Sequence, residues 1–131
     1  MDRDPLVVAR RARHLRFHRM VQRVSNTLPV QVQALLNNVA IVVQDEPTDQ
    51  QRSELASASC DIFGLYQGVP MIERGGGNML LPDQITIFAG PLTRHTRGTV
   101  DLEEQIRVTL LHEIGHHLGF DEAGVERLGL G

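Results

Sequence analysis

The sequence has no tryptophan, a single cysteine and no long apolar run. A membrane-spanning helix needs about 20 consecutive apolar residues, and an internal disulfide needs at least two cysteines. The charged N-terminus also lacks the apolar stretch of a secretory signal. These absences argue against a membrane protein and a disulfide-stabilised secreted protein. We therefore predict a cytoplasmic protein in which Cys60 is a small buried residue.

The sequence also has no lysine: all 13 of its Lys and Arg residues are arginines. Seven of these arginines lie within residues 1–23, whereas the remainder of the chain is acidic and the formal net charge is −3. A basic end can contact nucleic acid or an acidic partner, or form a solvated helix face. We predict an arginine-rich helix or leader over residues 1–24 and a second unit over residues 25–131, with nucleic acid not expected as a partner.

The apolar pattern changes its period along the chain, which predicts both helices and strands. The expected helices cover 6–24 and 29–37; the expected strands cover 38–44 and 83–90, with a hairpin inside 61–72. Residues 45–54 and 91–99 are expected to be loops because they are rich in polar residues and contain prolines. The order of these elements predicts an α+β fold, in which a short mixed sheet packs on helices.

A last helix is expected from Asp101, which forms a capping-box pattern with Glu104. Apolar residues then recur every three or four positions and predict a stripe that faces the core. The stripe consists of Leu102, Ile106, Leu110, Ile114 and Leu118. Gly119 stands where such a helix ends, because glycine readily takes the left-handed conformation of a helix C-terminus.

The segment "HEIGH" (112–116) on this helix carries the pattern H-E-x-x-H. His112 and His116 are four residues apart, so their rings project from one helix face and can bind one tetrahedral Zn²⁺. Glu113 is turned by about 100° from His112, given 3.6 residues per turn. It is therefore not a metal ligand, but it can reach a water on the metal and act as general base.

A third ligand is needed to complete this site, and Gly119 lets the chain turn back toward the metal. Asp121 and Glu122 are the two candidates, and carboxylate oxygen is an accepted zinc ligand. We favour Glu122, because it has the spacing of the third ligand in H-E-x-x-H-x-x-G-x-x-H. The alternative, two ordinary core histidines, is disfavoured because burying such titratable groups without a metal is costly. His117 points elsewhere and is expected either to support the metal ligands or to have a structural role.

The chain resembles the small bacterial zincin-like metallopeptidases, sometimes described as minimal zincins. The resemblance is carried by "HEIGHHLGFDE" (112–122), "GLYQGVP" (64–70) and "LPDQITIFAGPL" (81–92), and it extends over about residues 28–131. It implies a reduced zincin fold with the metal-binding, active-site helix near the C-terminus. The metal would be held by His112, His116 and an acid after Gly119.

The favoured hypothesis for function is a zinc-dependent metallopeptidase that hydrolyses peptide bonds through a metal-bound water activated by Glu113. Its substrate would be a peptide or protein, which strand 83–90 is a candidate to bind by its edge. Tyr66, the only tyrosine, is either an oxyanion donor or, by the favoured interpretation, a packed aromatic.

Two alternatives remain open at this point. No methionine follows Glu122 to form the turn found beneath the metal in metzincins, which would suit a non-catalytic, zinc-stabilised binding module. The second alternative is a metal-dependent endoribonuclease acting on ribosomal RNA, because such enzymes carry H-x-x-x-H-x-x-G-x-x-H and "GFDE" is similar to the end of that motif. The sequence does not predict an oligomeric state.

Overall fold

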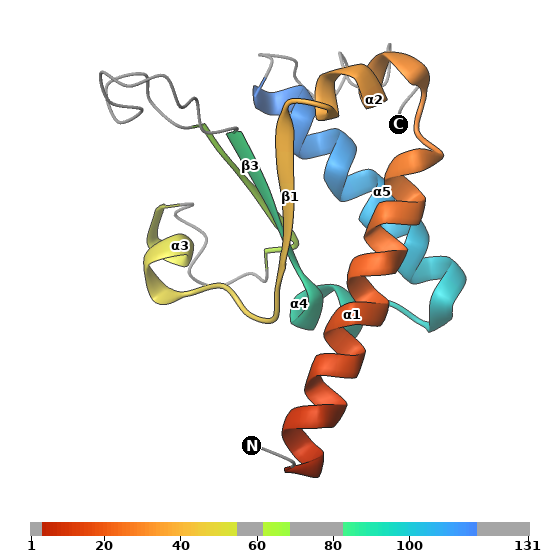
Figure 1. The fold of residues 1–131 in the computed structure, drawn as a ribbon. Helices are drawn as coiled ribbons and strands as arrows, with labels where there is room; N and C mark the ends of the chain where they lie inside the picture. Colours follow the sequence, from red (N-terminus) through yellow and green to blue (C-terminus); the bar gives the residue numbers. More distant parts are fainter. Residues whose placement is uncertain (1–3, 55–61, 69–82, 118–131) are drawn as a thin grey trace, which may run out of the picture.

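The computed structural model describes residues 4–54, 62–68 and 83–117. It confirms an α+β fold that combines a small mixed sheet with helices (Figure 1). Its elements in chain order are α1 (Pro5–Asn26), α2 (Val30–Leu36), β1 (Val39–Gln44), α3 (Asp49–Glu54), β2 (Gly64–Gln67), β3 (Asp83–Phe88), α4 (Ala89–Arg94) and α5 (Gly98–His117).

The three described strands form one sheet in the order β1-β3-β2. β1 runs parallel to β3, with Val39 opposite Asp83, whereas β2 is antiparallel to β3, with Gly64 opposite Ile87. β3 therefore has a partner on both sides. The expectation that strand 83–90 offers its edge to a substrate is wrong, because both edges already pair within the sheet. Among the described strands, β2 is an edge strand next to α5.

Helices α1, α2 and α5 lie on one side of the sheet, and α3 lies on the other (Figure 1). Successive side chains of a strand point to opposite faces, so Ile85 and Ile87 of β3 face the helices. Both are fully buried against Val21 of α1 and Ile106 of α5. The next residue, Phe88, points the other way and forms a second apolar cluster with Ile62 and Leu65.

Helix α5 presents the predicted apolar stripe to this core. Ile106 and Leu110 are fully buried and Ile114 is 3% exposed, while Leu102 is partly buried at the margin. The helix begins three residues before the predicted start, so Asp101 is not the N-cap. Its carboxylate instead accepts a hydrogen bond from the Arg97 backbone N–H (2.9 Å). The predicted end at Gly119, like Leu118, lies outside the described residues.

Two predicted loops contain short helices. Within 45–54, Thr48 and Gln51 cap the start of α3 reciprocally: the Gln51 N–H donates to Thr48 Oγ1 (3.1 Å), and the Thr48 N–H donates to Gln51 Oε1 (2.8 Å). α4 follows β3 directly at Ala89, so it includes the last two residues of the predicted strand 83–90 and extends into the predicted loop 91–99; its Leu92 is fully buried. Its Arg94 guanidinium binds both carboxylate oxygens of Glu46 (2.7 and 3.1 Å). These contacts stabilise helical turns that have no long apolar period.

The N-terminal helix α1 is longer than predicted and begins at Pro5, after the N-cap Asp4. Pro at the first helical position and a capping carboxylate both favour this start. The second half of α1 buries Phe17 and Val24 in the core, whereas its first half extends past the end of the sheet (Figure 1). The proposed division at residue 24 stays a prediction.

The remaining predicted elements are the helix 29–37, the strand 38–44 and the hairpin within 61–72. α2 and β1 confirm the predicted helix 29–37 and strand 38–44, and each of their ends lies within one residue of the predicted end. β2 lies where the first strand of the expected hairpin was predicted. Residues 69–72, predicted to form the second strand, and Cys60 lie outside the described residues, so the hairpin stays a prediction. None of the helices in the described segments is sufficiently long and apolar to cross a bilayer.

Candidate active site

The side chains of His112 and Glu113 lie on α5 beside a cleft of about 430 Å³. Both are half-buried, so they are in contact with the protein and accessible from the cleft. The remainder of the lining comes from the start of β2 and the residues before it, and from the preceding turns of α5. The lining residues are Ile62, Phe63, Gly64, Gln105, Val108, Thr109, His112 and Glu113.

The Glu113 carboxylate is held by the backbone of β2. The Tyr66 N–H donates a hydrogen bond to Glu113 Oε1 (3.0 Å), which joins residues that are 47 positions apart. An ionised acceptor makes such a bond stronger than one between two neutral groups. The sequence motif predicts a glutamate at this place on the helix, but it does not indicate the amide that orients it.

The side-chain hydroxyl of Tyr66 binds β3, whereas its backbone N–H binds α5. The hydroxyl donates to Asp83 Oδ2 (2.9 Å), and the ring packs against the main core. Burial, together with the hydrogen bond and the negative charge of Asp83, raises the pKa of Tyr66 to about 12. This arrangement supports the interpretation of Tyr66 as a packed aromatic. The contribution of Tyr66 to the site is its backbone N–H.

The predicted metal-ligand residues are only partly within the described structure. The α5 backbone places His112 and His116 one helical turn apart, as the motif requires. The His116 side chain and the whole of Asp121 and Glu122 lie outside the described residues. Within the part that is described, no group of three or more His, Cys, Asp or Glu side chains is arranged to hold a metal ion. The ligand set therefore stays a prediction.

Comparison with known families decides where this fold belongs. Residues 36–131 match the family model described as zincin-like metallopeptidase. The chain belongs to the zincin-like metallopeptidase family. The match includes the sheet, the cleft and the H-E-x-x-H helix, and it confirms the family predicted from the sequence segments. Helix α1 precedes the matched region.

One solved structure similar to this zincin-like protein is a conserved hypothetical protein from Thermus thermophilus. The two chains are 24% identical, the TM-score is 0.53, and the alignment covers 79% of this chain and 91% of the other. At this level of identity the likeness shows a shared fold alone. Comparison with curated proteins gives no match.

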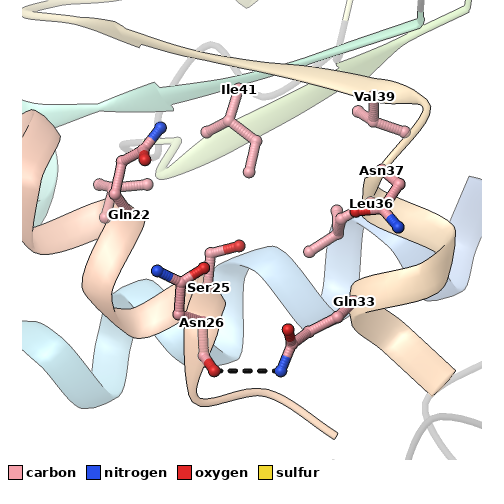
Figure 2. Close-up of a pocket in the computed structure, with 9 residues that line it drawn as sticks. Gln22, Ser25, Asn26, Gln33, Leu36, Asn37, Val39 and Ile41 are labelled. Atoms are coloured by element: carbon pink, nitrogen blue, oxygen red, sulfur yellow. Dashed lines mark hydrogen bonds between the residues drawn. The ribbon is translucent and has the colours of Figure 1, made fainter. Parts of the chain in front are cut away.

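Two other hollows of the zincin-like protein have a different lining. One of about 270 Å³ lies between α1, α2 and β1 (Figure 2), and neither histidine nor carboxylate lines it. There Gln33 Nε2 donates to the backbone oxygens of Asn26 (3.0 Å) and Leu28 (2.7 Å), which ties α2 to the end of α1. The other, of about 450 Å³, places Arg10 and Arg13 of α1 across from Asp45. The first offers no metal ligand or base, and neither includes the H-E-x-x-H residues.

The Tyr66 hydroxyl gives a test of the contact between β2 and β3. Replacement of Tyr66 by phenylalanine removes the bond to Asp83 and is expected to lower the free energy of unfolding by about 1 kcal/mol at neutral pH. The pKa of the phenol is higher in the folded protein (about 12) than its ordinary value of 10.0. The stability it contributes is therefore complete below pH 10 and is lost as the pH rises toward 12.

Denaturant unfolding of the wild type and Tyr66→Phe at about pH 8 and about pH 11, on either side of the ordinary phenol pKa, measures both effects. We expect the difference in stability between the two proteins to shrink at the higher pH. An equal difference at both pH values would show that neither burial nor the Asp83 contact raises the pKa of the phenol in the folded protein. Asp83→Asn serves as a control, because it leaves the burial of the ring and an acceptor in place and removes only the negative charge. The pKa of the phenol should therefore fall only in part.

Proposed function

We propose that this zincin-like protein is a zinc-dependent metallopeptidase with Glu113 as its general base. The observation that carries the proposal is the shared position of His112 and Glu113. Both face one open cleft, and the Glu113 carboxylate is fixed there by the Tyr66 N–H. A general base must be held within hydrogen-bond reach of the proton that it removes. The family match over residues 36–131 supports the same class of reaction.

The residues present fit a zinc ion chemically. His112 supplies an imidazole at the cleft, His116 follows one turn later, and Glu122, or alternatively Asp121, would complete the ligand set. Zinc prefers such nitrogen and oxygen donors in tetrahedral sites. When bound, the ion would polarise the scissile carbonyl and make a water molecule more acidic.

The protein itself would move the proton. Glu113 accepts it from the attacking water and then transfers it to the leaving amine of the substrate. The Tyr66 N–H stabilises the ionised carboxylate before the proton is taken, because it donates to Oε1. The hydrogen bond also limits rotation of the glutamate side chain, so the base does not have to be ordered when the substrate arrives.

The cleft also suits an extended peptide. Among the described strands β2 lies at the edge of the sheet beside α5, and an extended peptide can add to such an edge through main-chain groups other than the Tyr66 N–H, which is bound to Glu113. Ile62, Phe63 and Val108 give the adjacent cleft an apolar wall. We therefore expect a peptide or unfolded protein substrate with an apolar side chain beside the scissile bond.

Incubation of the zinc-loaded protein with unfolded casein and, separately, with structured RNA tests this function. We expect casein fragments that accumulate with time and are lost on addition of a chelator, while the RNA stays intact. Cleavage of the RNA alone would support the endoribonuclease alternative. Inactivity against casein and against a broad peptide library would instead support a zinc-stabilised binding module.

A further inference from the structure

Strand β2 and helix α5 approach each other closely at Gly64. A Cβ atom on this residue would lie 2.7 Å from Thr109 Cγ2, 3.3 Å from the Thr86 backbone oxygen and 3.4 Å from Glu113 Cγ. The first distance is too short for two carbon atoms. Only glycine permits the observed separation of strand and helix at this position.

The Thr109 methyl group cannot turn away without the loss of another contact. The Thr109 hydroxyl donates to the Gln105 backbone oxygen (2.7 Å), and this bond fixes the side-chain rotamer. Thr109 borders the cleft but is only 6% exposed, so most of its surface is packed against neighbouring atoms. Because packed interiors transmit such displacements, a larger residue at 64 would move β2 away from α5.

The same short separation brings the Tyr66 N–H to Glu113. Residues 64 and 66 lie two positions apart on β2, so their N–H groups point to the same side of the strand. The Tyr66 N–H points away from β3, since it is donated to Glu113 Oε1 at 3.0 Å. Movement of β2 at Gly64 would lengthen this bond directly.

We propose that Gly64 is a positioning residue for the general base: it allows β2 to present the Tyr66 amide to the Glu113 carboxylate. The inference rests on the proposed function for its catalytic consequence, but the contact itself is independent of that function. Gly64 does not touch the reacting atoms. It acts through the backbone of β2 and through Glu113.

Gly64→Ala is expected to lower kcat by about tenfold to a hundredfold, because small misplacements of a catalytic group have effects of this size. The affinity for zinc should change much less, since the proposed ligands lie on or after α5 and not on β2. KM is expected to rise as well, because β2 is also the proposed peptide-binding edge and Gly64 lines the cleft. Thr109→Ser should restore part of kcat in the Gly64→Ala background. Serine keeps the hydroxyl that binds Gln105 and lacks the Cγ2 atom that meets the new Cβ.

The single tyrosine of the chain gives a readout that does not need activity. Protein labelled with ¹⁵N-tyrosine shows one backbone amide resonance, that of Tyr66. Its proton shift reports the hydrogen bond to the carboxylate. We expect the shift to move upfield in Glu113→Gln and in Gly64→Ala, and to return toward the wild-type position in Gly64→Ala/Thr109→Ser. Thr109→Ser alone completes the cycle and corrects for its own effect.

The outcomes separate the inference from the proposed function. A Tyr66 resonance that is unchanged in Gly64→Ala and Glu113→Gln would overturn the inference, even if the protein cleaves peptides. The expected pattern of shifts in a protein without any peptidase activity would refute the proposed function and support the positioning of Glu113 by Gly64. If Gly64→Ala does not fold, the Glu113→Gln shift and refolding of the double variant still test the contact.

Discussion

Glu113→Gln is expected to lower kcat/KM for peptide hydrolysis by about 10²- to 10⁴-fold, the usual contribution of a general base, while the zinc content stays unchanged. Glutamine has nearly the same shape as glutamate, and its side-chain oxygen can still accept from the Tyr66 N–H. It cannot take a proton from water at neutral pH. Zinc should remain because Glu113 is turned away from the face that carries His112 and His116.

Peptide hydrolysis and elemental analysis of the same purified sample measure the two parts of this prediction. Glu104→Gln is a matched control on the same helix, since Glu104 is exposed and pairs with Arg107 (3.3 Å) away from the cleft. The control should retain the wild-type rate. If zinc and full activity both survive in Glu113→Gln, the role assigned to Glu113 is wrong.

Removal of the imidazole of His112 or of His116 is expected to reduce peptide hydrolysis at least as strongly as Glu113→Gln, because the protein would no longer hold zinc. His112→Ala and His116→Ala should each reduce zinc from about one ion per chain to near zero and abolish hydrolysis, because two remaining protein ligands make an incomplete site. His18→Ala on α1 is the control and should keep both properties. A full equivalent of zinc in His112→Ala would refute the proposed ligand set.

The same measurement distinguishes the two candidates for the third ligand. Glu122→Ala is expected to weaken zinc binding more than Asp121→Ala, because Glu122 has the spacing of the third ligand in the extended motif. The ratio of zinc bound by the two variants at a fixed, buffered zinc concentration gives the answer. A larger loss in Asp121→Ala would assign the ligand to Asp121 and leave the remainder of the site unchanged.

The sequence alone was sufficient to predict those helices and strands whose apolar pattern repeats over neighbouring residues. In α5, Ile106, Leu110 and Ile114 recur at helical spacing and are buried as predicted. The alternation in β3 likewise predicted a strand, which the structure confirms at Asp83–Phe88. The H-E-x-x-H motif indicated the family for a similar reason, because two ligands and a base can be specified by their spacing on one helix.

The short helices α3 and α4 could not be predicted from local apolar spacing. The capping pair Thr48 and Gln51 is present in the sequence, but six residues are too few to show an apolar period. α4 depends on Leu92 entering the core and on the ion pair of Arg94 with Glu46, which is 48 positions away. Such short helices are marginal in isolation and form because tertiary contacts stabilise them.

The sequence by itself determined the class of fold, the helix that carries His112 and Glu113, and the chemistry that these side chains offer. Only the tertiary structure decided that β3 is central, that β2 lies beside α5, and that Gly64 brings the Tyr66 amide to Glu113. The reason is physical: helical spacing is encoded within a few neighbouring residues, whereas strand order and a hydrogen bond across 47 positions arise only when separate segments pack together.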